Sequence, residues 1–185
     1  MTSAFAAIAL AGTLACAGSL VVLHLLPTGY NPLEDAVSDY GVGRFRRWYR
    51  AQTTANAIAA VALAVALGEA LKPAPRRVIV LLVVFAIARF LIPWFPTDLR
   101  GAAPTSTGRR HALLAGVAFL TIALAAGSLP GHDHGSGLRA LGVIVIAAAI
   151  GTALAVRRLR WFGAVERLFY LSMLTWIVVA AVELI

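Results

Sequence analysis

Six long apolar runs divide this chain of 185 residues, and they constrain its fold more than any other feature. Each run is about as long as an α-helix must be to cross the ~30 Å hydrocarbon core of a bilayer. Membrane-spanning strands would instead be about 10 residues long with alternating polarity, and the runs do not alternate. The sequence therefore predicts an all-α, polytopic membrane bundle of about six transmembrane helices, at residues 4–26, 51–71, 78–95, 112–129, 140–156 and 168–185.

Composition agrees with a membrane protein. Hydrophobic residues make up 61% of the chain and charged residues 13%, whereas soluble domains carry about 25% charged residues. We expect residues 1–185 to form a single transmembrane helical domain in which Gly12, Gly116 and Gly151 allow helices to approach closely. Cys16 is the only cysteine, so the chain has neither an internal disulfide nor a cysteine-based zinc site.

Positive charge is distributed unevenly among the loops. The formal net charge is +8, and eleven of the 16 Lys and Arg residues lie in the first, third and fifth connections, here called the odd loops. We expect the protein to lie in the cell membrane (the inner or plasma membrane). Because basic residues mark cytoplasmic loops, the odd loops should face the cytoplasm and both termini should lie on the outer side. This distribution predicts membrane lipids as partners and no nucleic acid, while the oligomeric state stays unknown.

Aromatic residues show the same asymmetry. The odd loops are long and polar, the other loops are short, and twelve of the 16 aromatic residues lie in or beside the odd loops. An aromatic belt that anchors the helices is one interpretation, but belts normally form at both interfaces. A one-sided aromatic lining predicts instead a pocket for an apolar or amphiphilic molecule. The twelve residues are Tyr30, Tyr40, Phe45, Trp48, Tyr49, Phe90, Trp94, Phe95, Trp161, Phe162, Phe169 and Tyr170.

Two sets of motifs carry a family resemblance. The pattern P-x-G-Y-N-P…S-D-Y-G follows the first run, while F-P-T-D and G-R-x-H precede the fourth. Together they resemble the integral-membrane family numbered 998 among domains of unknown function, over most of the chain from Pro27 to the sixth run. The resemblance implies a bundle of about six helices and no particular activity. It also implies four shared polar positions, which here are Ser38, Asp39, Asp98 and His111.

These four polar residues are the predicted catalytic residues. Two carboxylates beside apolar walls resist ionisation, so one of them can stay protonated and act as a general acid. A nucleophilic triad of Ser38, His111 and Asp98 is an alternative, but no G-x-S-x-G motif surrounds the serine. Both aspartates with His111 offer metal ligands without a typical metal-site spacing, and we predict neither a metal nor a cofactor. A further alternative is structural, with the aspartates as caps and turn residues.

Arg89 lies inside the third apolar run, where an arginine costs roughly 2.5–3.5 kcal/mol on insertion scales unless it snorkels or pairs. We predict that it reaches Asp98 or Asp39, and snorkelling to a lipid phosphate is the alternative. Asn56 and Gln52 are four residues apart on one helical stripe and either line the pocket or join helices. The predicted substrate-binding residues are Tyr40, Arg89, Trp94, Trp48, Asn56 and Trp161.

Three classes of function fit these features. The leading prediction is an enzyme that acts on a lipid or isoprenoid-like amphiphile by acid–base chemistry. A non-catalytic accessory or lipid-organising protein is the alternative. A proton-coupled carrier is disfavoured because the polar residues cluster at one end of the bundle and leave no relay through its middle. The H-D-H sequence at 132–134 is predicted to be a hydrophilic turn, because three adjacent residues converge poorly on a metal.

Overall fold

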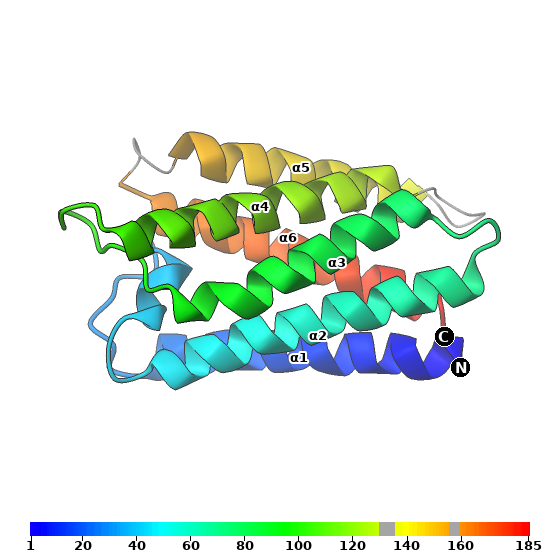
Figure 1. The fold of residues 1–185 in the computed structure, drawn as a ribbon, viewed down its shortest axis with the longest axis horizontal. Coiled ribbons are helices and arrows are strands. Elements are labelled where there is room, and N and C mark those ends of the chain that lie inside the picture. Colours follow the sequence, from blue (N-terminus) through cyan, green and yellow to red (C-terminus); the bar gives the residue numbers. More distant parts are fainter. Residues whose placement is uncertain (130–135, 156–159) are drawn as a thin grey trace.

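The computed structural model describes residues 1–129, 136–155 and 160–185, and these residues form six α-helices without a strand (Figure 1). Two short 3₁₀ helices, η1 at Val37–Gly41 and η2 at Ile92–Trp94, lie between them. The helices are α1 (Thr2–Leu25), α2 (Arg46–Ala70), α3 (Arg76–Leu91), α4 (Ser106–Ser128), α5 (Ser136–Ala155) and α6 (Phe162–Val182).

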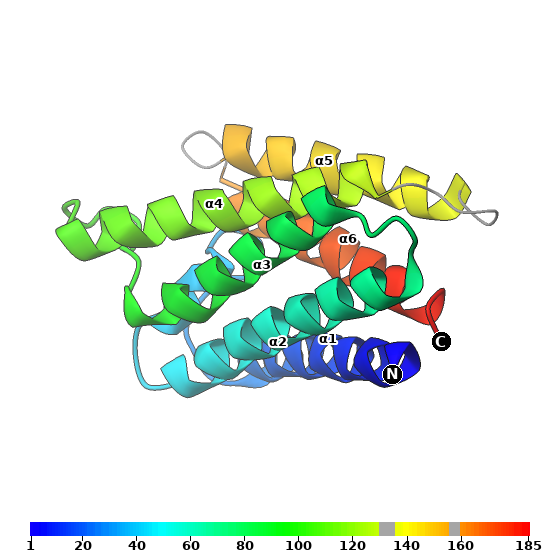
Figure 2. The ribbon, with the colours of Figure 1, turned by 45° about the vertical axis from the view of Figure 1, so that its right-hand side comes forward.

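The helices form a bundle in which the helix axes are roughly aligned with one another (Figures 1 and 2). Helices that follow one another in the chain pack together, and α6 also packs against α1 and α2. The α1–α2 and α3–α4 connections lie at one end, while both termini and the α2–α3 connection lie at the other (Figure 1). Six candidate spans meet the length and hydropathy that a membrane crossing requires. The prediction of a polytopic α-helical membrane protein is therefore confirmed.

Three helices begin earlier than the apolar runs predict. α2, α4 and α6 start at Arg46, Ser106 and Phe162, about one and a half turns before runs that begin at residues 51, 112 and 168. Helix formation needs backbone hydrogen bonds and tolerates polar side chains, so hydropathy does not mark the first turns. α4 also has a side-chain cap, since Thr105 Oγ1 accepts a hydrogen bond from Gly108 N at 2.9 Å.

Close helix packing is confirmed at only one of the three glycines. A Cβ at Gly12 would lie 3.0 Å from the carbonyl oxygen of Ala55, so α1 and α2 meet backbone to backbone there. Gly116 has nothing within 4 Å of a Cβ, and the position at Gly151 meets Val165 at an ordinary 3.7 Å. Periodicity alone does not reveal which face of a helix meets a neighbour and which meets lipid.

Candidate functional site

Residues 26–45, here called loop one, fold back over the end of the bundle and are fastened to the start of α6. Val37 N donates a 2.6 Å hydrogen bond to Glu166 Oε2, and Ala164 N donates to the carbonyl oxygen of Leu33 at 3.0 Å. Gly163 leaves the space that loop one occupies, because a Cβ there would lie 2.6 Å from a loop-one carbonyl oxygen. The first turns of α6 are therefore the support of loop one.

Arg167 makes the largest set of side-chain bonds in this region. Its Nε donates to His24 Nε2 at 2.7 Å, and its Nη1 donates to the carbonyl oxygens of Asp35 and Gly163, both at 2.9 Å. Its Nη2 donates to the Tyr40 hydroxyl at 3.2 Å. The planar fork of a guanidinium suits several acceptors at once, so one side chain joins α1, loop one and α6.

The bonds of His24 define its protonation. A guanidinium only donates, so His24 Nε2 must accept the bond from Arg167. The other ring nitrogen, Nδ1, lies 2.6 Å from the carbonyl oxygen of Leu20 and must donate to it. This hydrogen-bond pattern is that of the tautomer with a hydrogen on Nδ1, and the ring packs edge-on against Tyr40 at a centroid distance of 5.6 Å.

Asp39 is a buried carboxyl group in η1, with a side chain that is 8% exposed. Its Oδ2 accepts a 2.9 Å hydrogen bond from Ala36 N at the start of the same short helix. Burial raises the pKa of Asp39 from 3.8 to about 6, and the hydrogen bond from Ala36 opposes this increase. Asp39 is thus a group that can gain and lose a proton near neutral pH.

Asp98 and His111 hold the connection between α3 and α4. Asp98 accepts hydrogen bonds from Thr105 N at 2.9 Å and from Thr105 Oγ1 at 2.7 Å, and these bonds hold its pKa below the usual range. A Cβ at Gly108 would collide with the Asp98 carboxylate, which explains the glycine of the G-R-x-H motif. His111 Nδ1 donates to the carbonyl oxygen of Phe95 at 2.7 Å. The contacts of Asp98 agree with the structural alternative, in which the aspartates act as caps and turn residues.

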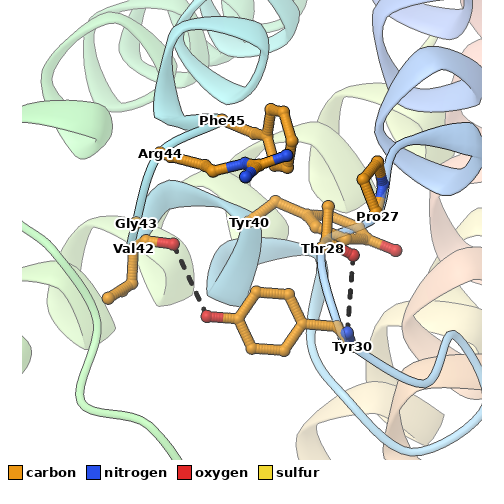
Figure 3. Close-up of a pocket in the computed structure, with 8 residues that line it drawn as sticks. All are labelled: Pro27, Thr28, Tyr30, Tyr40, Val42, Gly43, Arg44 and Phe45. Atoms are coloured by element: carbon orange, nitrogen blue, oxygen red, sulfur yellow. Dashed lines mark hydrogen bonds between the residues drawn. The ribbon is translucent and has the colours of Figure 1, made fainter.

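Loop one also forms a pocket of about 190 Å³ (Figure 3). The Tyr30 hydroxyl lies 3.5 Å from the carbonyl oxygen of Val42, and Tyr30 N donates to Thr28 Oγ1 at 3.4 Å. The rings of Tyr30 and Tyr40 pack edge to face, with centroids 5.7 Å apart. The pocket is lined by Pro27, Thr28, Tyr30, Tyr40, Val42, Gly43, Arg44 and Phe45.

Comparison with known families supports the motif resemblance. The family described as "Protein of unknown function (DUF998)" matches residues 10–183. The chain belongs to this family. Its description assigns no activity, so a function for this DUF998 member must be argued from its own residues. Searches of curated proteins and of solved structures gave no match.

The four family positions do not form one hydrogen-bonded group in the described part of the DUF998 chain. Ser38 and Asp39 belong to η1, whereas Asp98 and His111 bond to residues of the α3–α4 connection. The two loops do meet, since Arg100 Nη2 donates to the carbonyl oxygen of Glu34 at 2.9 Å. His111 and Asp98 therefore have partners other than Ser38, and the catalytic roles stay predictions.

Metal ligation gains no support from the geometry. Within residues 1–129, 136–155 and 160–185, no group of three or more His, Cys, Asp or Glu side chains could hold a metal ion. The H-D-H sequence at 132–134 lies outside the described residues.

The predicted substrate-binding residues lie in different places. Trp94 and Trp161 are surface residues, 59% and 71% exposed, and Trp94 packs under the Arg50 guanidinium at 4.8 Å. Trp48 is half-buried near the start of α2. Asn56 is fully buried in α2, where its Nδ2 lies 4.0 Å from Met173 Sδ. Of the six predicted residues, only Tyr40 lines the pocket.

The predicted partner of Arg89 is wrong. Its side chain is 2% exposed and therefore does not snorkel to the lipid headgroups. Its Nη2 donates to Gln52 Oε1 at 3.0 Å, and its Cζ lies 5.4 Å from the centroid of the Tyr170 ring, a cation–π distance. Arg89 thus joins α3 to α2 and α6 inside the bundle instead of reaching an aspartate in a loop.

A double-mutant cycle tests this partner. The Arg89–Gln52 hydrogen bond involves a charged donor, so Gln52→Leu and Arg89→Leu should show a coupling of about 1.5–3 kcal/mol in the free energy of unfolding. The measurement is equilibrium unfolding of the detergent-solubilised protein. Asp98→Asn combined with Arg89→Leu should be additive within about 0.5 kcal/mol. A stronger coupling of Arg89 to Asp98 than to Gln52 would contradict this partner and support an Arg89–Asp98 ion pair.

Sequence reasoning missed Glu166 and Arg167. Both lie in the fifth connection, where the sequence indicates only that arginines mark topology. The available signal was an adjacent acid and base at the edge of an apolar run, one helical turn after a glycine. Only the three-dimensional structure shows that Glu166 accepts a hydrogen bond from Val37 N and that Arg167 donates to four acceptors.

Proposed function

We propose that this membrane protein acts on a lipid or isoprenoid-like amphiphile by acid–base chemistry, with Asp39 as the proton donor. The headgroup of the amphiphile enters the loop-one pocket. The observation that carries this proposal is the buried carboxyl of Asp39, with a pKa of about 6. Asp39 does not itself line the pocket, but it directly precedes Tyr40, which does. General acids work best when their pKa lies near the working pH.

The position and size of the pocket support an amphiphile. The pocket lies in a loop at one end of the candidate spans, where the headgroups of a bilayer would lie. Its volume of about 190 Å³ corresponds to roughly six water molecules at ~30 Å³ each. A headgroup fits this space, whereas an acyl or isoprenyl chain would remain along the apolar outer surface of the helices.

The proposal assigns different tasks to the surrounding residues. Asp39 supplies the proton while Tyr40 and Tyr30 form the aromatic walls that orient the headgroup. Arg167 positions Tyr40 through the bond to its hydroxyl. Ser38 lies next to Asp39 in η1, and Asp98 and His111 shape the neighbouring loop. Roles for these three residues in the chemistry are predictions.

The proposal can be tested by complementation. Membrane lipids of a deletion strain are compared by mass spectrometry with those of strains that express the wild type, Asp39→Asn or Asp35→Asn. The substrate should accumulate in the deletion strain and in the Asp39→Asn strain. It should be consumed in the wild-type and Asp35→Asn strains. Consumption of the substrate by Asp39→Asn would rule out Asp39 as the acid.

A non-catalytic lipid-binding or accessory protein is the second candidate. It is favoured by the capping roles of Asp39 and Asp98, each of which accepts hydrogen bonds from nearby backbone. Under this alternative the lipid profile of the deletion strain would be restored by Asp39→Asn as well as by the wild type. The same strains therefore separate the two functions.

We further propose that the protein lies in the cell membrane with the odd loops in the cytoplasm. The support is the excess of basic residues in those loops. In a Cys16→Ser background, single cysteines at Leu33 and Ala103 should resist an impermeant thiol reagent in intact cells, and one at Lys72, in the α2–α3 connection, should react. All three positions are exposed, so reagent access depends on sidedness. The reverse labelling pattern would invert the topology.

A further inference from the structure

We propose that the loop-one pocket binds a phosphate monoester, and that Arg44 is the cation that recognises it. This inference rests on the proposed function in one respect: the phosphate is taken to be the headgroup of the amphiphile. Binding of phosphate and attachment of that phosphate to an apolar chain are separate claims, so they can fail separately.

The pocket is rich in hydrogen-bond donors. Arg44 contributes a guanidinium with five N–H groups. Tyr40 accepts a bond from Arg167, so the hydrogen of its own hydroxyl is directed elsewhere. Thr28 Oγ1 likewise accepts a bond from Tyr30 N, so its hydroxyl hydrogen is available to a ligand. Arg44, Tyr40 and Thr28 thus each keep a donor hydrogen among the residues that line the pocket.

The same pocket offers few acceptors. None of the eight lining residues carries a carboxylate. Two carboxylates nearby in sequence bond to the backbone of their own loop, since Asp35 Oδ2 accepts from Asn31 N at 2.8 Å and Asp39 Oδ2 accepts from Ala36 N at 2.9 Å. The Val42 carbonyl oxygen faces the Tyr30 hydroxyl. An ammonium-bearing headgroup would therefore find aromatic rings but no carboxylate among the lining residues, whereas an anion would find the guanidinium of Arg44.

The guanidinium of Arg44 has a defined place in the pocket wall. Its Cζ lies 4.4 Å from the centroid of the Phe45 ring, and Figure 3 shows the two side chains together on one side of the pocket. A second guanidinium, that of Arg167, lies 5.8 Å from the centroid of the Tyr40 ring. Arg is the side chain best suited to bidentate contacts with phosphate. Because the Arg44 guanidinium already stacks on an aromatic ring, it has fewer orientations to lose when a phosphate binds.

The test uses a matched pair of soluble probes with the purified full-length protein in a neutral maltoside detergent. Dihexanoyl phosphatidic acid and dihexanoylglycerol differ only in the phosphate. Isothermal titration calorimetry should show at least tenfold tighter binding of the phosphate form. Arg44→Gln should weaken binding of that form about tenfold to a hundredfold, as expected for the loss of charge-assisted bonds. Binding of dihexanoylglycerol should not change.

Arg47→Gln is the matched control, because Arg47 is an exposed arginine close in sequence that does not line the pocket. At physiological ionic strength, its loss should change the affinity less than twofold. Equal affinity for the two probes would overturn the phosphate site. Equal weakening by Arg44→Gln and Arg47→Gln would also overturn it, since it would show a general attraction to the basic surface.

Inorganic phosphate distinguishes the source of the ligand. If inorganic phosphate binds much more weakly than dihexanoyl phosphatidic acid, the acyl part of the probe contributes to binding, as expected for an amphiphilic ligand. Equal binding of the two, still sensitive to Arg44→Gln, would support the phosphate site and assign it to a soluble ligand. In that case the phosphate inference stands, and the amphiphile of the proposed function fails.

Discussion

Replacing Asp39 by asparagine is expected to lower the rate of the proposed reaction by about 10²–10⁴-fold, the usual contribution of general acid catalysis. Asparagine keeps the shape of the side chain, and its Oδ1 can still accept the hydrogen bond from Ala36 N that Asp39 Oδ2 accepts at 2.9 Å. What disappears is the proton. Initial rates with isolated membranes would measure the effect, and melting of the solubilised protein would show that the fold is kept.

Asp35 provides a control in the same loop. Its Oδ2 accepts a 2.8 Å hydrogen bond from Asn31 N, a bond of the same kind as that made by Asp39. Asp35→Asn should therefore reproduce any effect on the loop backbone and leave the rate unchanged. If both variants lose activity equally, the cause is the fold of loop one and not the proton of Asp39.

The pH dependence follows from the same carboxyl. The neutral form is the donor, so the rate should fall about tenfold per unit as the pH rises above the pKa of about 6. Stability should show a related effect, because the folded protein binds this proton more tightly than an unfolded chain with a pKa of 3.8. The contribution of Asp39 to stability should thus decrease as the pH rises from about 4 to about 6, then level off. Asp39→Asn should remove the pH dependence of the rate and the contribution of this carboxyl to the pH dependence of stability.

The number and type of the elements could be predicted from the sequence because a bilayer demands long apolar helices. The starts of α2, α4 and α6 could not, since a helix continues through polar residues that hydropathy assigns to loops. This difference matters for the site. Glu166 lies before the predicted sixth run and His111 at the edge of the fourth, but both are buried side chains on helices.

The candidate site was predictable in position but not in its contacts. Asp39 and Asp98 were expected in loops that share one end of the bundle, and Figure 1 shows those two loops together. Their partners depend on how the chain packs. Gln52 comes 37 residues before Arg89, and nothing in the spacing distinguishes it from the two aspartates as a partner.

Two glycines show why some motif residues can be explained only in three dimensions. Gly108 gives space to the Asp98 carboxylate, and Gly163 gives space to the backbone of loop one. A sequence pattern shows where such glycines are but not what lies against them. Both glycines are in the first turns of helices that receive a loop, so they help to position the two loops that carry the family motifs.

Arg167→Met is expected to loosen loop one and lower the free energy of unfolding by about 3 kcal/mol. Methionine keeps much of the apolar stem but provides no donors, so four acceptors lose their partner, among them His24 Nε2 and the Tyr40 hydroxyl. For a protein of this size, ~3 kcal/mol corresponds to a decrease of about 6–12 °C in the melting temperature. Thermal unfolding of the solubilised protein would measure it.

Limited proteolysis distinguishes this effect from a general loss of stability. Loop one and the start of α2 contain four arginines between residues 44 and 50, so trypsin should cut there much faster in Arg167→Met than in the wild type. Arg167→Lys should recover only part of the protection, because one ammonium cannot reproduce the planar fork. Arg160→Met, at an exposed position two residues before α6, should behave as the wild type. Unchanged cleavage in Arg167→Met would mean that Glu166 and the packing at Gly163 hold loop one without the arginine.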